Sequence, residues 1–111
     1  MAGKNILMLS NVPDAETARK LGRALIESRL AACVNCLPQV TSVYRWQGAI
    51  EEASEIMLLI KTTAEKYAQA EALIKVMHPY ELPEIIAFAM DQGLPAYLKW
   101  IEQEVQKDEN L

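Results

Sequence analysis

Residues 31–63, AACVNCLPQVTSVYRWQGAIEEASEIMLLIKTT, contain two segments rich in β-forming side chains on either side of a Gln47-Gly48 pair. Two such segments around a two-residue turn are typical of a β-hairpin. Ala31–Trp46 and Ala49–Thr63 are therefore predicted to be the strands of one long hairpin. Pro38 interrupts the first strand, and because proline cannot donate a ladder hydrogen bond, it indicates an edge strand or a bulge.

The segments that flank the hairpin complete a split βαβ pattern. In chain order we predict an apolar strand over residues 6–9, a helix from Asp14 to about Ser28, the hairpin, a helix over 64–77 ended by His78-Pro79, a core strand over 84–90, and a last helix with Tyr97, Leu98, Ile101 and Val105 on its inner side. The order strand, helix, strand, strand, helix, strand predicts an α+β, ferredoxin-like fold (βαββαβ plus a C-terminal helix).

The composition excludes several classes of protein. The 111 residues, 51% of them hydrophobic, suffice for one core and predict a single domain over residues 1–111. The net charge of −4 leaves no basic face for a nucleic acid. No apolar run reaches the roughly 20 residues of a membrane span, and Met1–Asn5 lacks the regions of a signal peptide. We therefore expect a cytoplasmic protein without a membrane partner, in which Cys33 and Cys36 are reduced.

The strands themselves predict self-association. Ile56–Ile60 is apolar at every position, as are residues 6–9 and 85–90, whereas a sheet with helices on one face should alternate apolar and polar residues. Both sheet faces should therefore be apolar, and the last helix is too short to cover four strands. Copies of the chain are the economical cover, so we expect a homo-oligomer with the hairpin tip on a neighbour. A monomer with a third layer is the other interpretation, but few elements remain to build it.

Several separated motifs closely resemble the CutA divalent-cation tolerance family. They are Leu30–Asn35, Ser42–Gly48, Glu55 with Lys61–Thr63, and His78–Ile85, and Tyr97–Trp100 extends the match. The resemblance spans nearly the whole chain, with the motifs in the family's order. It implies a ferredoxin-like homotrimer similar in architecture to the PII nitrogen-signalling proteins. It also implies a role in the tolerance of divalent cations, copper above all.

His78 is the sole histidine and the first candidate metal ligand. An imidazole at a helix end suits copper or zinc, but a histidine there also suits the helix dipole as a C-terminal cap. Some family members carry a cysteine matching Ser10 and a second histidine matching Met77, and this chain has neither. A hydroxyl is a poor ligand for a soft metal and a thioether favours Cu(I), so the departures argue against high-affinity Cu(II) binding. A divalent cation such as copper is therefore a possible cofactor, with none obligatory.

Cys33 and Cys36 are spaced like a CxxC motif. Residues three apart on a strand point to opposite faces, so the two thiols share a metal only if Pro38 bends the strand or a bulge intervenes. No second CxxC supplies the other ligands of a closed zinc site. We expect Cys33 in the core, retain it with His78 as a candidate metal ligand, and regard Cys36 as an incidental thiol.

A second set of residues is a candidate ligand cleft or interface where His78 meets a neighbouring subunit. Its members are Tyr44, Trp46, Glu55, Lys61, Tyr80, Glu81, Glu84 and Trp100. Polar groups beside apolar walls are typical of small-ligand sites. In the other interpretation they form an interface network, with Lys61 paired to a carboxylate and the aromatic rings packed.

Three functions are left to distinguish. No nucleophile flanked by a base, no HExxH and no glycine-rich phosphate loop is recognisable, so we expect a non-enzyme. The leading hypothesis is a homotrimeric cation-tolerance protein that binds a divalent metal weakly through His78. The alternatives are a PII-like signalling trimer that takes a small metabolite in the intersubunit cleft, and a scaffold that anchors a partner protein through Tyr44 and Trp46.

Overall fold

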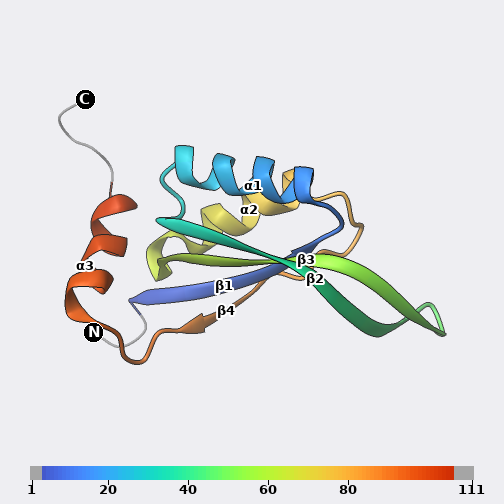
Figure 1. The fold of residues 1–111 in the computed structure, drawn as a ribbon. Helices are drawn as coiled ribbons and strands as arrows, with labels where there is room; N and C mark the ends of the chain where they lie inside the picture. Colours follow the sequence, from blue (N-terminus) through green and yellow to red (C-terminus); the bar gives the residue numbers. More distant parts are fainter. Residues whose placement is uncertain (1–3, 107–111) are drawn as a thin grey trace.

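The computed structural model describes residues 4–106 and arranges them as a four-stranded antiparallel sheet with helices (Figure 1). The strand order is β2-β3-β1-β4. This is the ferredoxin-like order that the split βαβ pattern predicts, so the predicted fold class is confirmed. The elements are β1 (Asn5–Val12), α1 (Ala15–Glu27), β2 (Cys33–Trp46), β3 (Ala49–Thr63), a 3₁₀ turn (Ala64–Lys66), α2 (Tyr67–Met77), β4 (Ile86–Ala89) and α3 (Pro95–Glu104).

The first strand is longer than predicted. It was predicted to end at Leu9, but β1 continues to Val12 and pairs with residues 56–58 of β3. Val12 and Ser10 are fully buried there, and burial together with strand pairing outweighs the turn preference of Ser10 and Asn11. Helix α1 then begins after Asp14, whose side chain accepts a hydrogen bond from the Thr17 backbone N–H at 2.8 Å and so caps the first turn.

The hairpin contains the predicted turn and a bulge. Gln47 and Gly48 have φ values of 51° and 84°, the pair of positive angles typical of a type I′ turn. The pairing of β2 with β3 shifts between Leu37 and Val40, where Pro38 lies. Because β2 is also an edge strand, both interpretations of Pro38 are confirmed. The distal half of the hairpin projects beyond the rest of the molecule (Figure 1).

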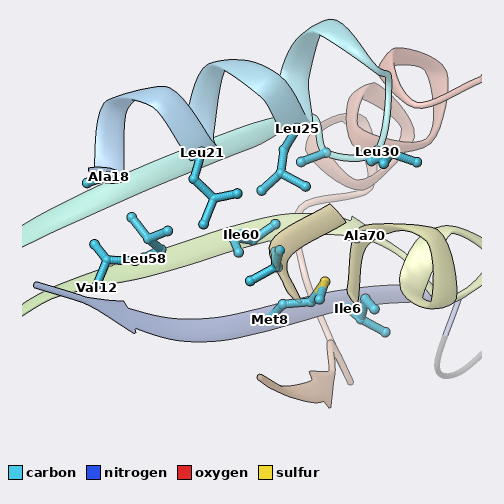
Figure 2. Packing of buried hydrophobic residues seen from close by; sticks show 12 residues of the cluster. Ile6, Met8, Val12, Ala18, Leu21, Leu25, Leu30, Leu58, Ile60 and Ala70 are labelled. Carbon is cyan, nitrogen blue, oxygen red and sulfur yellow. The ribbon is translucent and has the colours of Figure 1, made fainter. Parts of the chain in front are cut away.

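Helices α1 and α2 cover one face of the sheet and form the core with it (Figure 2). On α2, Ala70 and Ile74 are buried, and the partly buried Tyr67, Leu73 and Met77 pack against the core. The fully buried side chains from the strands include Met8, Leu58 and Ile60, and those from α1 include Leu21 and Leu25. The helix-covered face therefore holds the hydrophobic core of the single chain.

The opposite face of the sheet is apolar, and within residues 4–106 it is largely uncovered. Leu7 and Leu9 of β1 alternate with the buried Ile6 and Met8, so they point away from the helices. Side chains directly paired with Leu7 and Leu9 share that face. It includes the half-buried Leu9, Met57 and Leu59 and the exposed Leu37, Ile86 and Phe88. We call this surface the open face, and it fits the prediction that both sides of the sheet are apolar.

Two predictions for the C-terminal part were wrong in detail. The strand expected as a core strand over 84–90 is only Ile86–Ala89, and all four of its residues are exposed, because β4 is an edge strand that pairs with β1 alone. On α3, Ile101 and Val105 are buried as predicted, but Tyr97 is 39% exposed. The helix lies at one end of the sheet (Figure 1), so only part of its inner side is covered. No helix of the described residues is long and apolar enough to cross a membrane.

Candidate functional site

His78 links the end of α2 to β1. Its backbone is extended because Pro79 follows, and its N–H bonds the Ile74 carbonyl to close the helix. The ring Nε2 lies 2.7 Å from the Asn11 carbonyl oxygen, and Nδ1 lies 3.2 Å from the Tyr80 backbone nitrogen. Because a carbonyl only accepts and a backbone N–H only donates, the neutral ring carries its proton on Nε2. His78 is 7% exposed, so both ring nitrogens are held by the backbone in a buried position.

Glu55 and Tyr80 lie next to this histidine. The Tyr80 hydroxyl donates to Glu55 Oε2 at 2.8 Å, and the Tyr80 ring packs against His78 with 4.7 Å between centroids. Burial, and then the hydrogen bond and charge of Glu55, raise the pKa of Tyr80 to about 12. Glu55 is itself only 7% exposed, and it takes part in none of the ion pairs of residues 4–106. The site therefore holds a buried carboxylate with a phenol as its hydrogen-bond donor.

Asn11 connects the histidine to a second carboxylate. Its carbonyl accepts from His78, and its side-chain Nδ2 donates to Glu84 Oε1 at 3.2 Å. Sequence reasoning missed Asn11 because the first strand was predicted to end at Leu9, two residues before it. The five residues brought together in this way, Asn11, Glu55, His78, Tyr80 and Glu84, are called the His78 cluster below.

Lys61 and Trp100 lie elsewhere in the same chain. Lys61 Nζ is 3.4 Å from the Tyr97 hydroxyl and 5.5 Å from the centre of that ring, which in turn lies 5.5 Å from the Trp100 ring. Glu55 and Lys61 are six positions apart on β3, about 20 Å at 3.3 Å per residue. Within a single chain, the residues of the predicted cleft therefore lie in two separate places. One is the His78 cluster, and the other consists of Lys61, Tyr97 and Trp100 and is called the Lys61 group.

The remaining cleft candidates are on the surface. Tyr44 and Trp46, near the tip of the hairpin, are 45% and 37% exposed. Tyr44 is on the same face of the hairpin as Glu55, because Tyr44 pairs with Glu51 and Val40 pairs with Glu55. Glu81 is exposed in the loop that follows α2. No hydrogen bond of the described residues joins these three side chains to His78.

The two cysteines do not share a site. Cys33 pairs with Lys61 and Cys36 with Leu58, so their side chains point to opposite faces, and the bulge begins only after Leu37. The expectation that Cys33 is a core residue was wrong: it is only half-buried, because it lies on the open face at an edge strand. Its Sγ lies 3.7 Å from Asn35 Oδ1. Cys36 is largely exposed but lines a shallow groove between α1 and β2. The partial loss of water around its thiol in this groove raises the pKa of Cys36.

The donor atoms of residues 4–106 do not form a ready-made metal site. His78 has both ring nitrogens engaged, and Cys33 lies beside Lys61 rather than in the His78 cluster. Between residues 4 and 106, no three His, Cys, Asp or Glu side chains are grouped so as to hold a metal ion. The fully buried Ser10 Oγ has no hydrogen-bond partner in this part of the chain, but a hydroxyl is a weak ligand for soft metals. A metal could bind His78 only by displacing one of its backbone partners.

The raised pKa of Tyr80 gives a direct test of the His78 cluster. Its pKa lies above the usual 10.0, so the stability that this group contributes is complete below about pH 10 and is lost as pH rises through about 12. In an ultraviolet titration of phenolate, we expect a step near pH 12 that is absent from Tyr80→Phe and retained in Tyr97→Phe. A wild-type protein whose tyrosines all ionise near pH 10 would contradict the described environment of Tyr80.

The fold and the His78 cluster define a ferredoxin-like α+β protein with a hydrogen-bonded polar site at one end of its sheet. Residues 6–104 match the family model described as CutA1 divalent ion tolerance protein. The chain belongs to this family, and the resemblance read from its motifs is confirmed. The name of the family refers to ion tolerance and to no reaction, in agreement with the expectation of a non-enzyme.

Similar proteins are known in sequence and in structure. The divalent-cation tolerance protein CutA of Thermus thermophilus is 44% identical over 97 residues, which cover 87% of this chain and 94% of that protein. The CutA protein of mouse is 43% identical over 98 residues, but the match spans only 55% of its length. The crystal structure of CutA from Xylella fastidiosa has a TM-score of 0.91 and 47% identity, and the match covers 93% of this chain and 99% of that one. One relative of known structure, CutA from Archaeoglobus fulgidus, is described as a periplasmic protein.

Proposed function

We propose that this protein contributes to the tolerance of divalent cations as a cytoplasmic homotrimer that binds a divalent ion, such as copper, weakly at His78. Family membership supports the link to divalent cations. The observation that supports the assembly is the open face, which carries half-buried and exposed apolar side chains on all four strands of the sheet. Light scattering or native mass spectrometry of the purified protein tests the assembly, and a particle of three 12.4 kDa chains is expected.

The open face favours self-association for a physical reason. Ile86 and Phe88 of β4 are 42% and 54% exposed, and Leu37 of β2 is 38% exposed. Apolar surface of this kind, continuous across a sheet, is unfavourable in water and normally marks an interface. The net charge of −4 and the absence of any basic residue on β1 and β4 make a polyanionic partner a poor match for it. The open face of a second copy of the chain is equally apolar and is therefore a suitable partner for it.

The contacts of His78 favour weak rather than tight metal binding. A copper ion must compete with the Asn11 carbonyl or the Tyr80 N–H for a ring nitrogen, and Ser10 and Met77 supply no strong second ligand. The carboxylates of Glu55 and Glu84 nearby add negative charge, which favours a cation over an anion at this place. These groups support an exchangeable ion rather than a permanent cofactor.

Calorimetric titration with copper tests the role of His78. We expect a weak binding heat for the wild-type protein that is lost in His78→Gln. The glutamine amide nitrogen can take the position of His78 Nε2 and donate to the Asn11 carbonyl, so it retains this hydrogen bond while removing the imidazole. Cys33→Ser serves as a control for the other candidate ligand. Identical isotherms for wild type and His78→Gln would remove His78 from metal binding.

Exposure of the hairpin tip favours a second function, the anchoring of a partner protein. Tyr44 and Trp46 are 45% and 37% exposed on one face of the tip, and Val43 and Ile50 are 62% and 70% exposed on the other. Aromatic side chains of this kind are common anchors at interfaces. A partner recovered by the wild-type protein and lost by a Tyr44→Ala/Trp46→Ala variant of unchanged mass would favour this function. Metabolite binding of the PII-like kind predicts instead that a small molecule raises the melting temperature in the absence of metal.

A further inference from the structure

The buried carboxylate of Glu55 lacks a positive partner within the described residues. It is 7% exposed, its hydrogen-bond donor is the neutral Tyr80 hydroxyl, and none of the ion pairs of residues 4–106 includes it. Asp14 and Glu84 nearby increase the negative charge around Tyr80 and Asn11. A carboxylate removed from water without a compensating charge is strongly unfavourable. The single chain therefore leaves the site of Glu55 incomplete.

Lys61 is a positively charged side chain that lacks a negative partner within the described residues. It is half-buried on the open face, where it contacts the Tyr97 hydroxyl and ring, and it forms no ion pair with a described carboxylate. It is also the sole lysine or arginine on this face of the four strands. The one other basic strand residue, Arg45, pairs with Ile50 and so points to the other side of the hairpin.

Glu55 and Lys61 share a face but cannot meet within one chain. Both are at odd positions of β3, so both side chains point to the open face. Their separation of about 20 Å along the strand far exceeds the combined reach of the two side chains. Two complementary groups at opposite ends of one surface satisfy each other only in a head-to-tail contact between copies. A contact of this kind closes into a ring when the copies are related by rotational symmetry.

We propose that Glu55 pairs with Lys61 of the partner subunit, so that each His78 cluster is completed by the Lys61 group of a neighbour. This inference rests on the homotrimer of the proposed function but not on metal binding. Because the ammonium group neutralises Glu55, it reduces the negative charge that would attract a divalent cation to the His78 cluster. Tyr97 and Trp100 accompany Lys61 into the junction and form its apolar wall.

A double-mutant cycle in the full-length, metal-free protein tests this pairing. Glu55→Gln retains an acceptor for Tyr80, and Lys61→Met retains the length of the side chain. Each single change is expected to lower the melting temperature of the assembly, because each leaves one buried charge unpaired. The double variant is expected to have a melting temperature at least as high as that of the less stable single variant. Within one chain, residues about 20 Å apart should instead give additive effects, so non-additivity reports a contact between copies.

The control cycle combines Glu55→Gln with Lys75→Met, an exposed lysine on α2, and its effects should add. Additive effects of Glu55→Gln and Lys61→Met in an intact trimer would overturn the pairing and leave the proposed function standing. Crosslinking adds a second measurement in a Cys33→Ser/Cys36→Ser background. With a short bismaleimide reagent, a mixture of Glu55→Cys and Lys61→Cys chains should yield covalent dimers, and either variant alone should not. Failure of the mixture to crosslink in a trimer would also overturn the pairing, whatever the copper titration gives.

Discussion

Replacement of Ile60 by alanine is expected to lower the free energy of unfolding by about 2–5 kcal/mol, the usual cost of truncating a buried aliphatic side chain. Ile60 is fully buried on β3, in the core formed with α1 and α2. The change removes apolar contacts and leaves a cavity between the sheet and the helices. Denaturant unfolding of the wild type and the variant at the same protein concentration measures the difference.

Val76→Ala is the matched control for this prediction. Val76 is 82% exposed on α2, so its truncation removes little buried surface and should change the stability by no more than about 0.5 kcal/mol. Equal effects of Ile60→Ala and Val76→Ala would contradict the position of the core. Far-ultraviolet circular dichroism of both variants separates a loss of stability from a loss of fold.

Much of the fold could be predicted from the sequence because its signals are local. The Gln47-Gly48 turn, the interruption at Pro38 and the stop at His78-Pro79 act through the backbone of the residues themselves. The exposure of β4 could not be predicted in this way. Its sequence is that of a buried strand, but its place at the sheet edge depends on pairing with β1, far away in the chain.

The candidate site was predicted in part. His78, Glu55, Tyr80 and Glu84 were proposed together, and the structure brings them together around one additional residue, Asn11. Asn11 contributes through its backbone carbonyl as well as its side chain, and a carbonyl has no residue-type signature in a sequence. The separation of Lys61 from Glu55, in contrast, follows from their spacing on a predicted strand and could have been derived without a structure.

Replacement of Leu59 by lysine is expected to dissociate the trimer into monomers. Leu59 adjoins Ile60 on β3 but points to the open face, where it lies opposite Leu9 of β1 and Asn35 of β2. In a single chain the lysine can extend its charged end into water, whereas in a closed trimer each copy would bury an ammonium group among apolar side chains. Such burial costs several kcal/mol per charge, and a closed trimer would bury three such charges.

Light scattering at micromolar concentration should therefore give the mass of one 12.4 kDa chain for Leu59→Lys and of three chains for the wild type and for Val76→Lys. The variant should keep the far-ultraviolet spectrum of the folded chain, because Leu59 is not part of the core between the sheet and the helices. A trimer that survives Leu59→Lys would place the subunit contacts on another surface. The Glu55–Lys61 pairing across the open face would then lose its structural basis, since both residues lie on the face that Leu59 occupies.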